Sequence, residues 1–184
     1  IAKDPTGNFL LALTLMERYK HPSLYIGRPC YHKLEDAKCH YRYWTSHRYS
    51  EEVLNSITKL IKTEMLSRKP SSLILIGHSG GGAIASLIAC QFDRPTYLIT
   101  IGANLDTEAW TNYHNWSALN GSLNPALDSK LCPQLTELHF HGAKDEQIPV
   151  ELNKNYFSYH HTKPIIIEDA THSNWTTSWS KIQD

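Results

Sequence analysis

The chain has 184 residues, and its 18 Lys and Arg balance its 18 Asp and Glu, so the formal net charge is zero. This balance gives no sign of a nucleic-acid-binding surface, and no apolar run is long enough to span a membrane. The length fits a single domain over residues 1–184, large enough to fold without a metal or a disulfide. We therefore expect no nucleic-acid partner, no membrane span, no cofactor and no metal.

Helical and strand patterns alternate along the chain. In chain order they predict a helix at 9–20, a strand at 23–27, a helix at 51–67, a strand at 72–77, a helix at 82–91, a strand at 96–102, a helix at about 106–114, a strand at 135–141, a helix at 150–160, a strand at 163–168 and a helix at 174–181. Most of the strand runs are continuously apolar rather than alternating, which is typical of parallel strands covered on both faces. The fold class is therefore α/β, with right-handed crossovers between parallel strands.

The helix at 51–67 has the clearest local signals. Ser50 is the expected N-cap, and Glu51 and Glu52 place negative charge in the first turn. One apolar stripe along this helix comprises Val53, Ile57, Leu60 and Ile61.

A long stretch at about 103–134, rich in aromatic and turn residues, predicts a small cap-like insertion over a site. Its aromatic side chains either wall an apolar acyl pocket or pack on one another: Trp110, Tyr113, His114 and Trp116.

The four cysteines could form a disulfide, remain free thiols or bind zinc. Cys30 and Cys39 flank a short polar stretch, and the residues alone leave open whether they close a disulfide or stay free thiols. A zinc site would use Cys30, His32, Cys39 and His40, but their spacing fits no zinc-finger pattern. Cys90 lies on an apolar helix face, where we expect an inert core thiol.

The sequence Gly77-His78-Ser79-Gly80-Gly81 matches G-x-S-x-G. The pattern alone is weak, but here a buried strand enters it and a helix of small residues leaves it, as a nucleophile elbow requires. Such a turn exposes the serine Oγ and directs the N–H of Gly80 to the place where an oxyanion forms, beside a helix N-terminus. The alternative is a glycine-rich turn that packs tightly or holds a phosphate, although no P-loop lysine follows.

A serine nucleophile needs a base and a carboxylate that orients the base. Asp145 follows the strand at 135–141, and His172 follows the strand at 163–168. Both therefore lie at the carboxyl edge of a parallel sheet, where the elbow also opens. Asp106 is a rival acid, but we favour Asp145. Four nearby ionisable residues are expected to be structural or to face solvent: His139, His141, Glu146 and Asp169.

Several stretches together resemble the α/β-hydrolase superfamily, and within it a group of poorly characterised bacterial α/β-hydrolase-like proteins. They are "GRPCYH" with a following Cys, "YWTSHRYSEEV", "GHSGGG", "GANLDTEAWTNYH" and "GSLNP". The resemblance covers almost the whole chain and implies a three-layer α/β/α sandwich with a mainly parallel sheet. It also implies a catalytic triad of Ser79, Asp145 and His172, a disulfide between Cys30 and Cys39, and a location in the cell envelope.

The chain departs from that family at its start. Three strands usually precede the helix that 9–20 resembles, and a loop before that helix supplies the second oxyanion donor. We therefore expect the N-terminal strands to be missing from this sequence, leaving a gap between 23–27 and 72–77 that an upstream segment or a second chain would fill. Unpaired backbone groups in such a gap would be costly.

The sequence thus predicts a serine hydrolase acting on a small-molecule ester or thioester. The catalytic residues are Ser79, Asp145 and His172, the oxyanion donor is Gly80, and candidate substrate-binding residues are Asn104, Trp110 and His114. The alternatives are an acyltransferase that uses the same triad, and a catalytically weak binding protein on a hydrolase scaffold.

Overall fold

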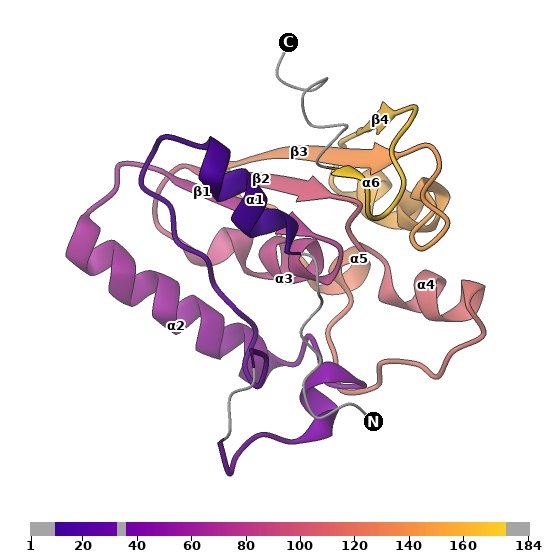
Figure 1. Cartoon of the computed structure of the whole chain (residues 1–184), viewed down its shortest axis with the longest axis horizontal. Helices are drawn as coiled ribbons and strands as arrows, with labels where there is room; N and C mark the ends of the chain where they lie inside the picture. The colour runs from indigo at the N-terminus through magenta and orange to yellow at the C-terminus, as the bar shows by residue number, and fades with distance from the viewer. Residues whose placement is uncertain (1–9, 33–35, 176–184) are drawn as a thin grey trace.

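Four parallel strands form a sheet with helices on both faces (Figure 1). The computed structural model describes residues 10–32 and 36–175. The strands lie in the order β1-β2-β3-β4: β1 (Leu73–His78), β2 (Thr96–Ile101), β3 (Leu135–Gly142) and β4 (Pro164–Ile167). The α-helices are α1 (Leu11–Arg18), α2 (Glu51–Arg68), α3 (Gly80–Ile88), α4 (Thr107–Tyr113), α5 (Pro125–Asp128) and α6 (Lys154–Tyr159). Three short 3-10 helices are η1 (Tyr41–Trp44), η2 (Ala89–Gln91) and η3 (Val150–Asn153).

The parallel pairing brings the carboxyl ends of all four strands to one edge of the sheet. His78 at the end of β1 pairs with Ile101 at the end of β2, and Ile101 pairs with Phe140 of β3. Residues that follow each strand therefore gather at this edge, although they lie far apart in the sequence.

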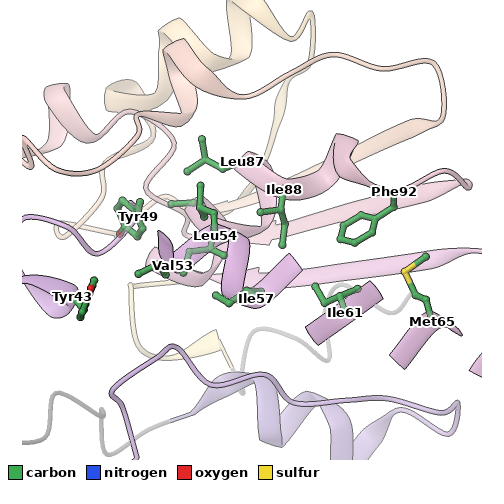
Figure 2. Packing of buried hydrophobic residues seen from close by; sticks show 12 residues of the cluster. Tyr43, Tyr49, Val53, Leu54, Ile57, Ile61, Met65, Leu87, Ile88 and Phe92 are labelled. Carbon is green, nitrogen blue, oxygen red and sulfur yellow. The ribbon is translucent and has the colours of Figure 1, made fainter. Parts of the chain in front are cut away.

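The core on one face of the sheet lies between α2, α3 and β1 (Figure 2). The Ser50 hydroxyl accepts a hydrogen bond from the Val53 N–H, so α2 begins at the predicted N-cap. The buried side chains of α2 are Val53, Leu54, Ile57, Thr58, Ile61 and Met65. Leu60, which we expected in this stripe, is instead 45% exposed. The buried face of α2 is therefore turned toward Leu54 and away from Leu60.

The helix α1 covers the opposite face of the sheet. Leu11 and Leu15 pack with Ile101 and Phe140, whose side chains point away from α3. Helices on both faces of a parallel sheet make a three-layer α/β/α sandwich. No helix in the described ranges is long and apolar enough to cross a membrane.

Residues 23–27 do not form the predicted strand. An apolar run needs a neighbouring strand to form a ladder, and none of the described residues pairs with it. Ile26 instead packs against the core between α2 and α3. Within the described ranges β1 is therefore an edge strand, not one side of an internal gap, and Ile74 and Ile76 on it are 44% and 41% exposed.

The remaining elements agree with the sequence to within a few residues. The stretch 103–134 contains the two short helices α4 and α5. The predicted helix at 174–181 lies largely outside the described residues.

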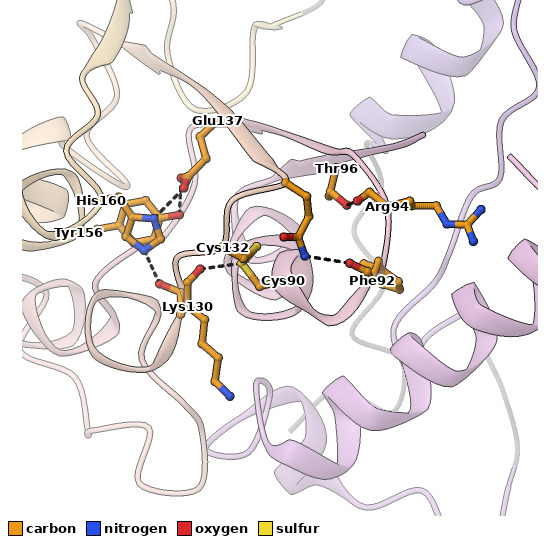
Figure 3. The surroundings of a disulfide bond; sticks show 11 residues. Cys90, Phe92, Arg94, Thr96, Lys130, Cys132, Glu137, Tyr156 and His160 are labelled. Atoms are coloured by element: carbon orange, nitrogen blue, oxygen red, sulfur yellow. Dashed lines mark hydrogen bonds and ion pairs between the residues drawn. A yellow bond between two sulfur atoms is a disulfide. The ribbon is translucent and has the colours of Figure 1, made fainter. Parts of the chain in front are cut away.

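All four cysteines are paired. Cys30 bonds to Cys39 with an S–S distance of 2.20 Å, which rules out the zinc site considered for Cys30, His32, Cys39 and His40. Cys90 bonds to Cys132 with an S–S distance of 2.08 Å (Figure 3), so the expectation of a free thiol at Cys90 is wrong. Cys90 lies in η2 at the end of the apolar helix, where it can reach the loop before β3.

Candidate active site

Ser79 lies at the sharp turn between β1 and α3. Its backbone has φ 53° and ψ −124°, a region that a residue with a side chain adopts at a cost of about 1–3 kcal/mol. The surrounding structure holds it there. The Ser79 N–H donates to the Ile101 carbonyl at 3.0 Å, and the Ser79 carbonyl accepts from the N–H of Gly82 at 3.0 Å.

Two glycines allow the strand and the helix to approach each other at this turn. A Cβ on Gly77 would lie 2.4 Å from the Gly81 carbonyl oxygen, and a Cβ on Gly82 would lie 2.4 Å from Ala103 Cβ. A side chain at Gly81 would meet nothing within 4 Å. The last glycine of G-x-S-x-G is thus not the one that packing requires here; Gly82 is.

His172 connects Ser79 to Asp145. Its Nε2 lies 3.0 Å from Ser79 Oγ, and its Nδ1 lies 2.9 Å from Asp145 Oδ2. A carboxylate accepts, so Nδ1 carries the proton and Nε2 of the neutral ring is left to accept from the serine hydroxyl. The three predicted residues therefore form one hydrogen-bonded series.

The carboxylate of Asp145 is fixed on its other side as well. Its Oδ1 accepts from the backbone N–H groups of Gln147 at 3.0 Å and Ile148 at 2.9 Å, and its side chain is fully buried. The preceding residues are tied to β4, because Ala143 N–H donates to the Ile167 carbonyl at 3.0 Å. These bonds hold the orientation of the carboxylate.

His78 secures the loop that carries His172. Its Nε2 lies 3.0 Å from the His172 carbonyl oxygen, so Nε2 must donate, and the two rings are 5.0 Å apart. Burial lowers the pKa of His78 to about 4, with a further contribution from the neighbouring His172. His78 is therefore neutral at physiological pH and serves as a hydrogen-bond donor.

Asn104 follows β2 and lies against the elbow. Its N–H donates to the Ser79 carbonyl at 3.4 Å. Its side chain is 2% exposed, and neither its Oδ1 nor its Nδ2 has a partner among the described residues. A buried amide without partners is costly, so this group is available to a ligand or a water.

The other two candidate substrate-binding residues, Trp110 and His114, have a structural contact. Trp110 Nε1–H and His114 Nε2–H donate to the same Gln147 carbonyl oxygen, at 3.0 Å and 2.8 Å. The rings of Trp110, His114 and Trp116 also pack on one another. The helix α4 is thus fastened to the loop that holds Asp145.

Comparison with known proteins places this geometry in context. The family model for Lipase (class 3) matches residues 12–98, which include Ser79. An esterase domain from a Rhodothermus marinus protein is 21% identical, with a TM-score of 0.51 over 70% of this chain and 62% of that chain. An acylaminoacyl peptidase from Pyrococcus horikoshii is 15% identical, with a TM-score of 0.54 over 68% of this chain and 24% of that chain.

The chain has an α/β-hydrolase fold. It spans less than two thirds of the length of both solved structures, and these similarities show the fold. No curated protein matches the sequence.

The rival acid has a structural role instead. Asp106 is the N-cap of α4: its Oδ1 accepts from the Ala109 N–H at 3.1 Å, and its Oδ2 accepts from Asn155 Nδ2 at 2.9 Å. Asp169 lies 3.3 Å from Lys144 at the surface, and Glu146 is exposed. Asp145, not these carboxylates, accepts the hydrogen bond from His172 Nδ1.

Two further histidines lie in a buried polar network around Glu137. The Glu137 carboxylate accepts from His139 at 2.9 Å, from His160 at 2.7 Å and from the Tyr156 hydroxyl at 2.8 Å (Figure 3 shows the last two). Burial raises the pKa of Glu137, but these hydrogen bonds outweigh it and hold the pKa at about 2. The network joins β3 to α6, in line with the structural role expected of His139.

Sequence reasoning missed His78. The residue occupies the first variable position of G-x-S-x-G, and its adjacency to Ser79 is the one sequence signal that could have indicated a role. Its bond to the His172 backbone joins positions separated by 94 residues, which no local pattern reveals.

Proposed function

We propose that this chain is a serine hydrolase that cleaves a carboxylic ester or thioester through an acyl-enzyme on Ser79. The observation that carries the proposal is the hydrogen-bonded series from Ser79 through His172 to buried Asp145, set on a serine with positive φ. Further support comes from the class 3 lipase model, whose match over residues 12–98 includes the elbow.

In the proposed acylation step, Ser79 Oγ attacks the carbonyl carbon while His172 Nε2 takes its proton. Asp145 holds the ring in the tautomer that leaves Nε2 free and stabilises the imidazolium that forms. His172 then delivers the proton to the leaving oxygen or sulfur. Water attacks the acyl-enzyme in the second step, with His172 again the base, and Ser79 leaves with its proton restored.

The N–H of Gly80 is the proposed oxyanion donor. It is the first residue of α3, so the helix N-terminus adds a favourable dipole. We expected the second donor to be missing from this sequence, and residues 1–9, before α1, lie outside the described residues. Asn104 remains a candidate substrate-binding residue because its buried amide has no partner among the described residues.

The two disulfides favour an oxidising compartment. Disulfides persist in secreted and envelope proteins and are rare in the cytosol. We therefore propose that the protein acts in such a compartment, as the family resemblance implies.

Covalent labelling with a fluorophosphonate probe tests the proposal. Wild type should be labelled, and Ser79→Ala should abolish labelling at equal folded concentration. Ser72→Ala, an exposed serine on the turn before β1, is the matched control and should be labelled like wild type. A folded wild type that is not labelled would instead support a binding protein on this scaffold. Adding an alcohol to the ester assay and analysing products separates hydrolysis from acyl transfer.

A further inference from the structure

The space beside Gly80 is occupied by two side chains from the segment before α2. A Cβ built on Gly80 would lie 2.7 Å from Tyr49 Oη and 3.4 Å from Arg28 Nη1. The hydroxyl of Tyr49 and the guanidinium of Arg28 therefore lie directly against the backbone of the residue that follows Ser79. Tyr49 is 2% exposed, so its hydroxyl reaches the elbow from inside the protein.

Arg28 is held in place by an aromatic ring. Its Cζ lies 4.2 Å from the centroid of the Tyr31 ring, and the Tyr31 N–H donates to the Arg28 carbonyl at 3.2 Å. Cys30, between Arg28 and Tyr31 in the sequence, is bonded to Cys39. Stacking uses the face of the guanidinium and leaves the N–H groups at its edge free to donate in the plane.

A second arginine approaches the same hydroxyl. Arg48 Cζ lies 5.7 Å from the centroid of the Trp110 ring, and its Nε donates to the Thr45 carbonyl at 2.9 Å. Burial raises the pKa of Tyr49, while the charges of Arg28 and Arg48 lower it in part. Both cations are therefore close enough to act on the Tyr49 hydroxyl.

Among the described residues no carboxylate pairs with Arg28 or Arg48, whereas three other arginines have carboxylate neighbours within 3.5 Å: Arg42, Arg68 and Arg94. Two guanidinium groups with no carboxylate partner among the described residues, both near one buried hydroxyl, form a site for an anion, and guanidinium geometry matches a carboxylate.

A cavity of about 260 Å³ lies beside Arg48. Arg48 and Trp110 line it together with Trp116, Thr111 and Leu119. It therefore continues from one of the two arginines along an apolar wall.

We propose that Arg28, Arg48 and Tyr49 form a carboxylate-binding subsite, and that the substrates are esters or thioesters that carry a free carboxylate in addition to the bond that is cleaved. This substrate class rests on the serine hydrolase proposed above. Arg28 and Tyr49 lie against Gly80, so the bound carboxylate is held beside the reacting carbonyl, and Arg48 extends the positive charge toward the cavity.

The test compares two esters that differ only in charge: mono-4-nitrophenyl adipate and its methyl ester, 4-nitrophenyl methyl adipate. We expect wild type to have a kcat/KM at least about tenfold higher for the charged ester, as charge-assisted hydrogen bonds allow. Arg28→Gln should reduce this ratio at least about fivefold, and added salt should reduce it in wild type. Arg28→Lys keeps the positive charge but loses the planar guanidinium, so it should retain part of the preference for the charged ester.

Arg68→Gln is the matched control. Arg68 ends α2, beyond the amino end of β1, and pairs with Glu64 at 2.9 Å on the surface, so its loss should leave the ratio unchanged. Equal slowing of both esters by Arg28→Gln would overturn the proposal, because it would make Arg28 an oxyanion stabiliser. A wild-type ratio near one would overturn it too.

Binding to the Ser79→Ala protein separates this inference from the proposed function. Calorimetry should detect monomethyl adipate binding at least about tenfold tighter than dimethyl adipate, and Arg28→Gln in the same background should remove the difference. If the probe labels Ser79 but charge has no effect on binding, the hydrolase stands and the subsite is wrong. If Ser79 is not labelled but charge-selective binding persists, the subsite stands and the hydrolase is wrong.

Discussion

His78 Nε2 donates a hydrogen bond to the carbonyl oxygen of His172, so the residue before the elbow serine holds the backbone of the residue that contacts it. The bond joins the last residue of β1 to the loop that follows β4, and these two strands lie on opposite edges of the described sheet. The distance from His172 to Ser79 thus depends on a contact outside the series of Ser79, His172 and Asp145.

Replacing His78 should therefore weaken the site without removing any of its three central groups. We expect His78→Phe, which keeps a ring and loses the donor, to slow fluorophosphonate labelling by about 10- to 100-fold, because small displacements at a reacting group have effects of that size. His78→Gln retains an N–H donor and should recover part of the rate. Equal rates for wild type and His78→Phe, measured at matched folded concentration, would show that the contact does not position His172.

Asp145 and Asp106 offer a matched pair for the acid. Asp145→Asn removes the acceptor that fixes the His172 tautomer and should slow labelling by about 10³- to 10⁴-fold. Asp106→Asn should lower the free energy of unfolding by about 1–3 kcal/mol, because its new amide would face the Asn155 amide. Its labelling rate per folded molecule should stay at the wild-type level. Slow labelling of Asp106→Asn together with wild-type labelling of Asp145→Asn would show that Asp106 is the acid.

The sequence located the candidate site because the relevant signals are tied to the sheet. Asp145 and His172 each follow a buried strand, and parallel strands bring their carboxyl ends together. Ser50 marked the start of α2 for an equally local reason, since the cap bonds to an N–H only three residues away.

The wrong predictions from the sequence concern features that depend on long-range contacts. The apolar run at 23–27 looks like a strand, but a strand exists only with a partner, and the described residues supply none. The Cys90–Cys132 bond joins positions 42 residues apart, so the apolar surroundings of Cys90 gave no hint of it. The contacts of Arg28 and Tyr49 with Gly80 are likewise long-range packing that only the structure reveals.

His141 should make the protein sensitive to acid. It is fully buried, and burial lowers its pKa to about 4, with the neighbouring His139 and His172 lowering it further and Asp145 opposing them. The unfolded chain takes up a proton near pH 6.5 and the folded chain only near pH 4, so stability falls as the pH drops through that window. For His141 alone the loss is roughly 3 kcal/mol.

Urea unfolding between pH 7 and pH 4 tests this. His141→Leu should reduce the pH dependence across the window, even if it lowers stability at pH 7, and His78, whose pKa is also lowered to about 4, should account for part of what remains. Glu137, whose pKa is held at about 2, contributes stability that is lost only below its unfolded value near 4.5, so it acts at lower pH. A His141→Leu protein with an unchanged slope between pH 6.5 and 4 would contradict the assignment.

The two disulfides should stabilise the fold unequally. The chain-entropy model relates stabilisation to the length of the closed loop, and the loops here span 42 residues for Cys90–Cys132 and 9 for Cys30–Cys39. We expect the paired replacement Cys90→Ala with Cys132→Ala to lower the free energy of unfolding by about 4 kcal/mol, and Cys30→Ala with Cys39→Ala by about 2.5 kcal/mol.

Urea unfolding of the two double variants, each compared with wild type under oxidising conditions, measures both values. Treating wild type with a reductant should lower its stability by at least as much as the Cys90 and Cys132 replacement does, because it opens both bonds. A larger loss from the Cys30 and Cys39 replacement would mean that native contacts of this segment, which carries Tyr31 beneath Arg28, outweigh the loop entropy.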